Sequence, residues 1–149
     1  MTLQTEFIPS GGVTTPLGFS AGVTNASIKN SPAKLPDLAI LVSETPCQVG
    51  GVFTRNRFKA APVILCRERL SNPPFSAIIV NSGNANAGNG DEGLADAFKT
   101  ADLTARKLGL PPEQILVSST GIIGQRLPMA LLAQGIKKII PTRDGGHDF

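Results

Sequence analysis

The second half of the chain repeats one pattern: an apolar strand, a glycine-rich loop and an amphipathic helix. The first copy has the β-branched run 76–82, the loop 83–90 and a helix with an apolar face made of Leu94, Phe98, Ala101, Ala105 and Leu108. The second has a strand at 115–118, the stretch "STGIIG", and a helix with Pro128 near its first turn and a stripe made of Met129, Leu132 and Ile136. Right-handed crossovers predict two parallel strands if both belong to one sheet. The fold class expected is α/β.

Both glycine-rich loops would then leave the carboxyl ends of neighbouring strands, at one edge of the sheet. In α/β sheets ligands bind at that edge, so the sequence predicts that the two loops share a site. The loop "NSGNANAGNG" (81–90) is either part of that site or an unusual surface turn. A phosphate loop is disfavoured, because Gly90 is followed by Asp91 and Glu92 and not by Lys-Ser/Thr, and no G-x-G-x-x-G occurs there.

Asp91 and Glu92 are acidic residues of the kind that stabilise the N-terminus of a helix. Asn89, with Glu92 three residues later, is a plausible cap for that helix, and Gly109 is predicted to end it.

The stretch "SSTGIIG" (118–124) places Thr120 and Gly121 directly after the second strand. A tetrahedral oxyanion requires preorganised donors, which the Thr120 hydroxyl and the Gly121 N–H can provide. The alternative is an ordinary Ser/Thr-Gly turn or helix cap, and the pattern alone favours that alternative. The segment "RNRFK" (55–59) has the same ambiguity between a solvated loop and a patch for an anionic substrate, with the loop favoured.

Three further strands are expected in the first half of the chain, at 37–44, 48–54 and 61–68. Gly50 and Gly51 suggest a bulge or a close backbone approach, and Pro62 lies near the start of its strand, where a missing N–H is tolerated. The first 36 residues are rich in Gly, Pro, Ser and Thr and should form irregular structure or short strands.

Composition excludes several classes of function. The 149 residues suit one domain, and 41% hydrophobic against 17% charged residues argues against disorder. Phe is the only aromatic residue type, which weakens a single-strand nucleic-acid function, and a net charge of +3 does not imply such a partner.

Cys47, Cys66 and the one histidine, His147, cannot complete a four-ligand zinc site, and buried structural thiols are expected. No signal peptide or membrane-spanning apolar stretch is recognised, so a cytoplasmic protein without metal or membrane is expected.

Four stretches together resemble one protein family. They are "GFSAGVTNASIK" (18–29), "GVFTRNRFKAAPV" (51–63), "VNSGNANAGNGDEGLADA" (80–97) and "SSTGIIGQRLPM" (118–129). In this order they are similar to the N-terminal part of the ornithine acetyltransferase / glutamate N-acetyltransferase family of arginine biosynthesis. The resemblance implies a layered α/β sandwich, with helices outside two sheets (α-β-β-α).

The resemblance also implies a mechanism. Family members cleave themselves at an Ala-Thr bond, and the new N-terminal Thr of the β chain carries the acetyl group from N-acetylornithine to glutamate. Some members also use acetyl-CoA as a substrate; no cofactor is implied. The oxyanion-hole pair of the family falls on Thr120 and Gly121, and the usual assembly is an α2β2 heterotetramer of α and β chains.

The sequence departs from the family pattern in one respect. The stretches Asn-Met-Ala-Thr, where cleavage occurs, and Lys-Gly-Ser-Gly, which contributes to substrate binding, do not occur in residues 1–149. We therefore expect residues 1–149 to be a single domain, an incomplete α-chain segment that is active only together with the β chain. The alternative is a non-catalytic binding or assembly module that retains the fold.

Overall fold

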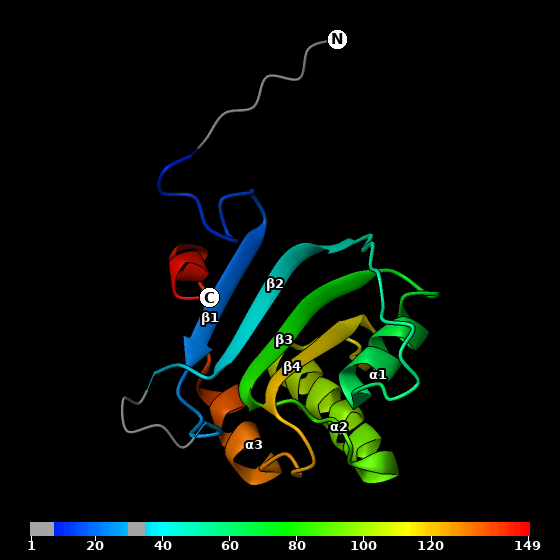
Figure 1. Cartoon of the computed structure of the whole chain (residues 1–149). Coiled ribbons are helices and arrows are strands. Elements are labelled where there is room, and N and C mark those ends of the chain that lie inside the picture. Colours follow the sequence, from blue (N-terminus) through cyan, green and yellow to red (C-terminus); the bar gives the residue numbers. More distant parts are fainter. Residues whose placement is uncertain (1–7, 30–34) are drawn as a thin grey trace.

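Four strands form one mixed sheet in the order β1-β2-β3-β4 (Figure 1). The computed structural model describes residues 8–29 and 35–149. The strands are β1 (Phe19–Thr24), β2 (Leu38–Cys47), β3 (Phe75–Asn84) and β4 (Ile115–Ile122). The pairs β1–β2 and β2–β3 are antiparallel, whereas β3 and β4 are parallel. The α/β class and the parallel pair predicted from the sequence are confirmed.

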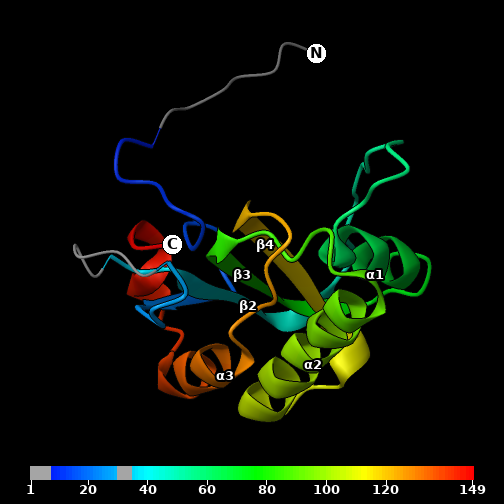
Figure 2. The same ribbon diagram turned by 60° about the horizontal axis from the view of Figure 1, so that its bottom comes forward.

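Helices α2 (Gly90–Leu108) and α3 (Met129–Lys138) lie side by side against one face of the sheet (Figure 2). The strands contribute alternate residues to the core beneath these helices, including Ile40, Ile79 and Val117, which lie opposite one another in the strand register. Helix α3 buries Leu132 and Ile136, as its stripe predicted. A short 3₁₀ helix, η2 (Arg143–His147), packs beside β1, where Thr142 pairs with Ala21.

Helix α2 begins and ends at the predicted residues. It follows Asn89 and stops at Gly109, which adopts the left-handed conformation with φ +69° that glycine accepts readily. However, Asn89 does not cap the helix with its side chain, which donates instead to the carbonyl of Gln125. A second short 3₁₀ helix, η1 (Pro112–Gln114), leads from this region into β4.

Two predicted strands in the first half are wrong. Residues 61–68 belong to helix α1 (Ala61–Arg69), with Pro62 in its first turn, where a proline needs no N–H partner. The short apolar run suited either element, and the buried spacing of Ala61, Pro62 and Leu65 is helical. Residues 48–54 form no strand, although the close approach expected at Gly51 exists: a Cβ there would lie 2.8 Å from the Leu70 Cδ2 atom.

Strand β4 is longer than predicted, because it continues from Ser118 through Thr120 and Gly121 to Ile122. Thr120 and Gly121 are therefore the last part of a strand and not a turn after it. Cys47 and Cys66 are both free, and both are only partly buried, whereas buried thiols were expected. Within residues 8–29 and 35–149, no helix is both long and apolar enough to cross a membrane.

Candidate functional site

The carboxyl ends of β3 and β4 lie side by side, together with the loops that follow them. Ser82 is paired with Thr120 and Gly83 with Gly121 in the parallel register. Beyond the strands, the two loops remain joined: the N–H of Gly124 donates to the carbonyl of Ala87 at 2.8 Å. The prediction that the two glycine-rich loops share one place in the fold is therefore confirmed.

The close contact at this edge requires glycine on both strands. Gly121 has φ +133° and Gly83 has φ +102°, conformations that disfavour side chains. A Cβ at Gly121 would lie 2.3 Å from the carbonyl carbon of Gly83. A Cβ at Gly83 would in turn lie 2.8 Å from the Cα atom of Lys29. No substitution fits at Gly121 unless the two strands move apart.

Thr120 lies on the sheet face opposite helices α2 and α3. Side chains alternate along a strand, and Ile115 and Val117 belong to the core on the helix side. Thr120 therefore lies on the other face, together with Leu116 and Ser118, and it is exposed. Among the residues that the structure describes, the Thr120 hydroxyl makes no hydrogen bond within the protein, so it is available to a ligand.

The backbone N–H of Gly121 is directed away from β3. The N–H of Val117 donates to the sulfur of Cys66, and the Cys66 thiol donates to the carbonyl of Val117. Since Cys66 belongs to α1, these two backbone groups of Val117 point to the outer side of β4, away from β3. Backbone polar groups repeat this direction every second residue. Ile122, one residue after Gly121, uses its carbonyl inward, toward Ala85 at 2.9 Å. The Gly121 N–H thus lies on the outer edge of β4, past the part that α1 covers.

Asn81 connects the two strands just before the glycine pair. Its side chain is 2% exposed and occupies the helix side of β3. Its Oδ1 accepts a hydrogen bond from Ser119 Oγ at 2.6 Å, and its Nδ2 donates to the Asn84 carbonyl at 2.8 Å. The residue directly before Thr120 is therefore held by a buried amide.

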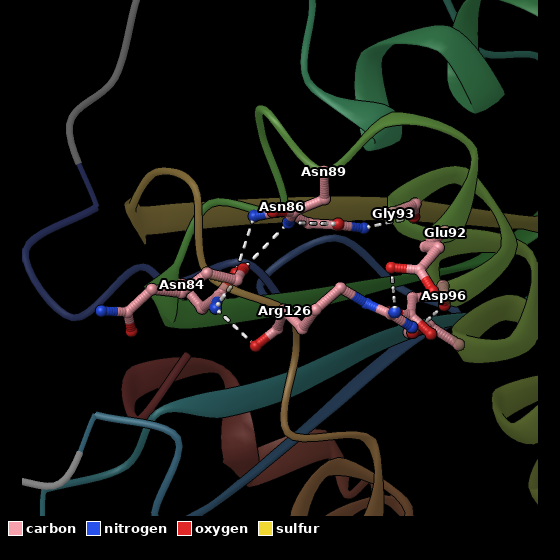
Figure 3. A network of polar contacts seen from close by, with 9 residues as sticks. Asn84, Asn86, Asn89, Glu92, Gly93, Asp96 and Arg126 are labelled. Atoms are coloured by element: carbon pink, nitrogen blue, oxygen red, sulfur yellow. Dashed lines mark hydrogen bonds and ion pairs between the residues drawn. The ribbon is translucent and has the colours of Figure 1, made fainter.

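A second group of amides holds the chain after β4 (Figure 3). Asn84 Nδ2 donates to the carbonyls of Gln125 and Arg126, at 3.0 and 3.1 Å, and its Oδ1 accepts from the N–H of Asn86. Asn86 Nδ2 donates to the carbonyl of Gly93 in the first turn of α2. A Cβ at Gly93 would lie 2.8 Å from Asn86 Oδ1, so glycine makes room for this amide. The loops after β3 and β4 and the start of α2 are thus one connected unit.

Arg126 completes this unit through two carboxylates of α2 (Figure 3). Its guanidinium contacts Asp96 at 2.9 Å and Glu92 at 2.6 Å, and these hydrogen bonds raise the pKa of Arg126 above its ordinary value. The Asp96 side chain is only 8% exposed, whereas that of Glu92 is 74% exposed. Glu92, from the acidic first turn predicted to favour the helix N-terminus, thus also binds the segment after β4, together with Asp96 one turn later.

The basic segment 55–59 lies beside the start of α2. A cavity of about 310 Å³ separates them, lined by Arg57, Phe58 and Lys59 on one side and by Asn86, Gly90 and Asp91 on the other. Most of the segment is exposed, in accord with the solvated loop favoured from the sequence. In the part of the chain that the structure describes, no three metal-ligating side chains gather, and His147 lies in η2 beside β1.

Sequence reasoning located Thr120, Gly121 and both loops, but it missed Asn81, Ser119 and Arg126. Of the asparagines in residues 81–90, only Asn89 was given a role, as the cap of a helix. Their spacing was the available signal: Asn81, Asn84, Asn86 and Asn89 recur every two or three residues after a buried strand, too often for a simple turn.

Comparison with known proteins identifies the family. The model of the ArgJ family matches residues 20–147. This chain belongs to the ArgJ family. It is 43% identical over 149 residues to the arginine biosynthesis bifunctional protein ArgJ of Dehalococcoides mccartyi, and 47% identical over 141 residues to that of Symbiobacterium thermophilum. It spans 37% and 35% of the length of these two proteins.

Solved ArgJ structures have the same fold. The crystal structure of the arginine biosynthesis bifunctional protein from Bacillus halodurans superposes with a TM-score of 0.89 at 36% identity, covering 95% of this chain and 74% of that one. Ornithine acetyltransferase from Mycobacterium tuberculosis, solved in complex with ornithine, gives 0.87 at 38% identity and covers 95% of this chain and 77% of that one.

Proposed function

We propose that this chain is the part of an ArgJ-type acetyltransferase that stabilises the tetrahedral oxyanion, through the Thr120 hydroxyl and the Gly121 N–H. The complete enzyme transfers acetyl from N-acetylornithine to glutamate, and acetyl-CoA, which some family members use, is a second donor to be tested. The acetyl group is carried on a threonine that lies outside residues 1–149, on a separate β chain in an α2β2 assembly, and the reaction takes place in the cytoplasm.

One observation carries this proposal: two adjacent donors are exposed at a strand end that is otherwise fixed. Among the described residues the Thr120 hydroxyl is unbonded, on the sheet face opposite α2 and α3, and the Gly121 N–H is on the outer edge of β4. The close Gly83–Gly121 contact fixes the backbone between them. A rigid pair of donors in a place that a second chain can reach suits a site where negative charge develops.

The chemistry then follows from the positions of the donors. The threonine oxygen of the partner attacks the acetyl carbonyl of N-acetylornithine, and the carbonyl oxygen becomes an anion held by Thr120 and Gly121. Collapse breaks the C–N bond, and the amine of ornithine leaves with the proton that the threonine lost. The amine of glutamate attacks the resulting ester through a second oxyanion of the same kind. N-acetylglutamate leaves and the hydroxyl is restored.

The lengths of the relatives support a division into two chains. Ninety-five per cent of this chain makes up 74% of the solved Bacillus halodurans chain, so that chain has about 190 residues. The same 149 residues make up 37% of the Dehalococcoides mccartyi protein, which has about 400. A solved chain of about half the full length is what a cleaved precursor would give.

The proposal is tested on the full-length protein, meaning residues 1–149 together with the β chain. The substrates are N-acetylornithine and glutamate. We expect acetyl transfer, an acetyl adduct on a threonine outside residues 1–149 after incubation with N-acetylornithine alone, and no turnover by residues 1–149 on their own. Mass spectrometry of intact and digested protein locates the adduct. Full-length protein that folds but transfers no acetyl group would overturn the proposal and favour a binding or assembly module.

A further inference from the structure

We propose that Asn81 and Asn84 are positioning residues for the oxyanion hole, and that their side-chain amides hold the Thr120–Gly124 segment at both its ends. This inference rests on the function proposed above. Asn81 binds Ser119, the residue before the segment, and Asn84 binds the carbonyls of Gln125 and Arg126, directly after it. The two asparagines are three residues apart on β3 and also bind each other, through Asn81 Nδ2 and the Asn84 carbonyl.

The segment needs such support because apolar packing does not provide it. Every residue from Thr120 to Gly124 is exposed, including Ile122 at 55% and Ile123 at 61%. By contrast, Asn81 and Asn84 are 2% and 5% exposed. The residues that carry the donors thus lie outside the core, and the residues that hold them lie inside it.

Both amides use their oxygen and their nitrogen. Asn81 accepts from Ser119 and donates to Asn84, while Asn84 accepts from the N–H of Asn86 at 2.8 Å and donates to two carbonyls. Both side chains are buried and each of their polar atoms already has a partner in the protein, which argues for positioning and against direct catalysis. Oxyanion donors are effective only when their geometry is set before charge develops, so small displacements of Thr120 and Gly121 should slow the reaction.

The first experiment removes the anchor before the segment, in the full-length enzyme. Ser119→Ala deletes the hydroxyl that binds Asn81; we expect kcat to fall roughly 10-fold while KM changes less than about twofold. Ser119→Thr keeps the hydroxyl and should recover most of the loss. The matched control is Ser76→Ala, which removes a similar Ser-to-amide bond, Ser76 Oγ to Gln114 Oε1 at 2.7 Å, at the opposite end of β3. It should leave kcat unchanged.

The second experiment changes the anchor after the segment. Asn84→Asp keeps the shape and the acceptor for Asn86 but places a carboxylate against the carbonyls of Gln125 and Arg126. We expect a fall in kcat of roughly 10- to 100-fold. The control is Asn72→Asp, which makes the same amide-to-carboxylate change at an exposed position in the bend after α1. It should leave kcat unchanged.

A double mutant distinguishes positioning from general structural support. If Ser119 acts through the oxyanion hole, Ser119→Ala should cost much less in a Thr120→Ala background than in the wild type. Full additivity of the two losses, or unchanged kcat in both Ser119→Ala and Asn84→Asp, would overturn the inference. Failure of the proposed function has a different signature, since Thr120→Ala itself would then keep wild-type kcat.

Discussion

The two ends of the β3–β4 pair are built on different principles. At the amino end, Ala77, Ile79, Ile115 and Val117 are buried under α2 and neighbouring helices, and α1 covers the outer edge of β4. At the carboxyl end, the same two strands carry glycines, asparagines and hydroxyls, and residues 120–122 of β4 are exposed. The amino end gains its stability from apolar burial. The carboxyl end has a geometry fixed by glycine contacts and hydrogen bonds instead of apolar burial. Substitutions at the two ends should therefore have separable effects, on stability at the first and on catalysis at the second.

Gly121→Ala should have the largest effect. A Cβ would lie 2.3 Å from backbone atoms of Gly83, so β3 and β4 must separate at the place where the donors lie. We expect acetyl transfer to fall at least as far as on loss of an oxyanion donor, about 10²–10³-fold in kcat.

Gly124→Ala is the matched control for this change. Gly124 also has positive φ, at +80°, but open space surrounds its Cβ position. It should show only the strain of a left-handed residue, about 1–2 kcal/mol of stability, with kcat nearly unchanged. Equal losses of kcat in both variants would show that the strand contact is not what matters.

Thr120→Ala is expected to lower kcat about 10²–10³-fold, roughly 3–4 kcal/mol, with a smaller change in KM. The hydroxyl is removed while the Gly121 N–H stays. Thr120→Ser keeps the hydroxyl but loses the methyl group that restrains χ1, so its kcat should be intermediate. Steady-state kinetics on the full-length enzyme provide the measurement. A Thr120→Ala enzyme with wild-type kcat would make Thr120 an ordinary strand residue.

Ile79→Ala tests the opposite end of the comparison. Ile79 is 1% exposed between Ile40 and Val117, and truncating such a side chain typically lowers stability by about 2–5 kcal/mol. We expect chemical denaturation to show this loss while kcat of the remaining folded enzyme is close to that of the wild type. A large fall in kcat at unchanged stability would contradict the division of the strand pair into a stable end and a catalytic end.

The same division explains what could be predicted from the sequence. The apolar runs of β2, β3 and β4, the α2 face and the α3 stripe were recognisable because burial leaves a periodic pattern. The run at 61–68 was short enough to suit either element, and only its packing on α2 and β4 decides for a helix. The carboxyl end was predicted to be a site from its glycines and its topology. The partners of Asn81, Asn84 and Arg126 outside their own loop are 30 to 42 residues away, which no local pattern predicts.

The ion pairs of Arg126 should be unequal, although one guanidinium makes both. Asp96→Asn removes a partner that is largely buried, whereas Glu92→Gln removes one that is exposed and screened by solvent. We expect the melting temperature to fall more for Asp96→Asn, and added salt to erase the effect of Glu92→Gln first. If Glu92→Gln is the more harmful change, the segment after β4 depends on the surface and not on the buried carboxylate.

The smallest predicted effect concerns Cys66, the residue of α1 that binds the outer edge of β4. Its thiol donates to the Val117 carbonyl at 3.1 Å, and burial raises the pKa of Cys66 above the ordinary value of a thiol. The folded protein therefore resists losing this proton more than the unfolded chain does. The contribution to stability is complete below the ordinary thiol pKa and declines as the pH rises above it.

Iodoacetamide should modify Cys66 more slowly than a free small thiol at neutral pH, and the rate should rise only in the alkaline range. Cys66→Ala should weaken the alkaline loss of stability without changing kcat at neutral pH. Rapid alkylation at neutral pH would mean that α1 opens readily from β4, and that both ends of this strand have an accessible edge.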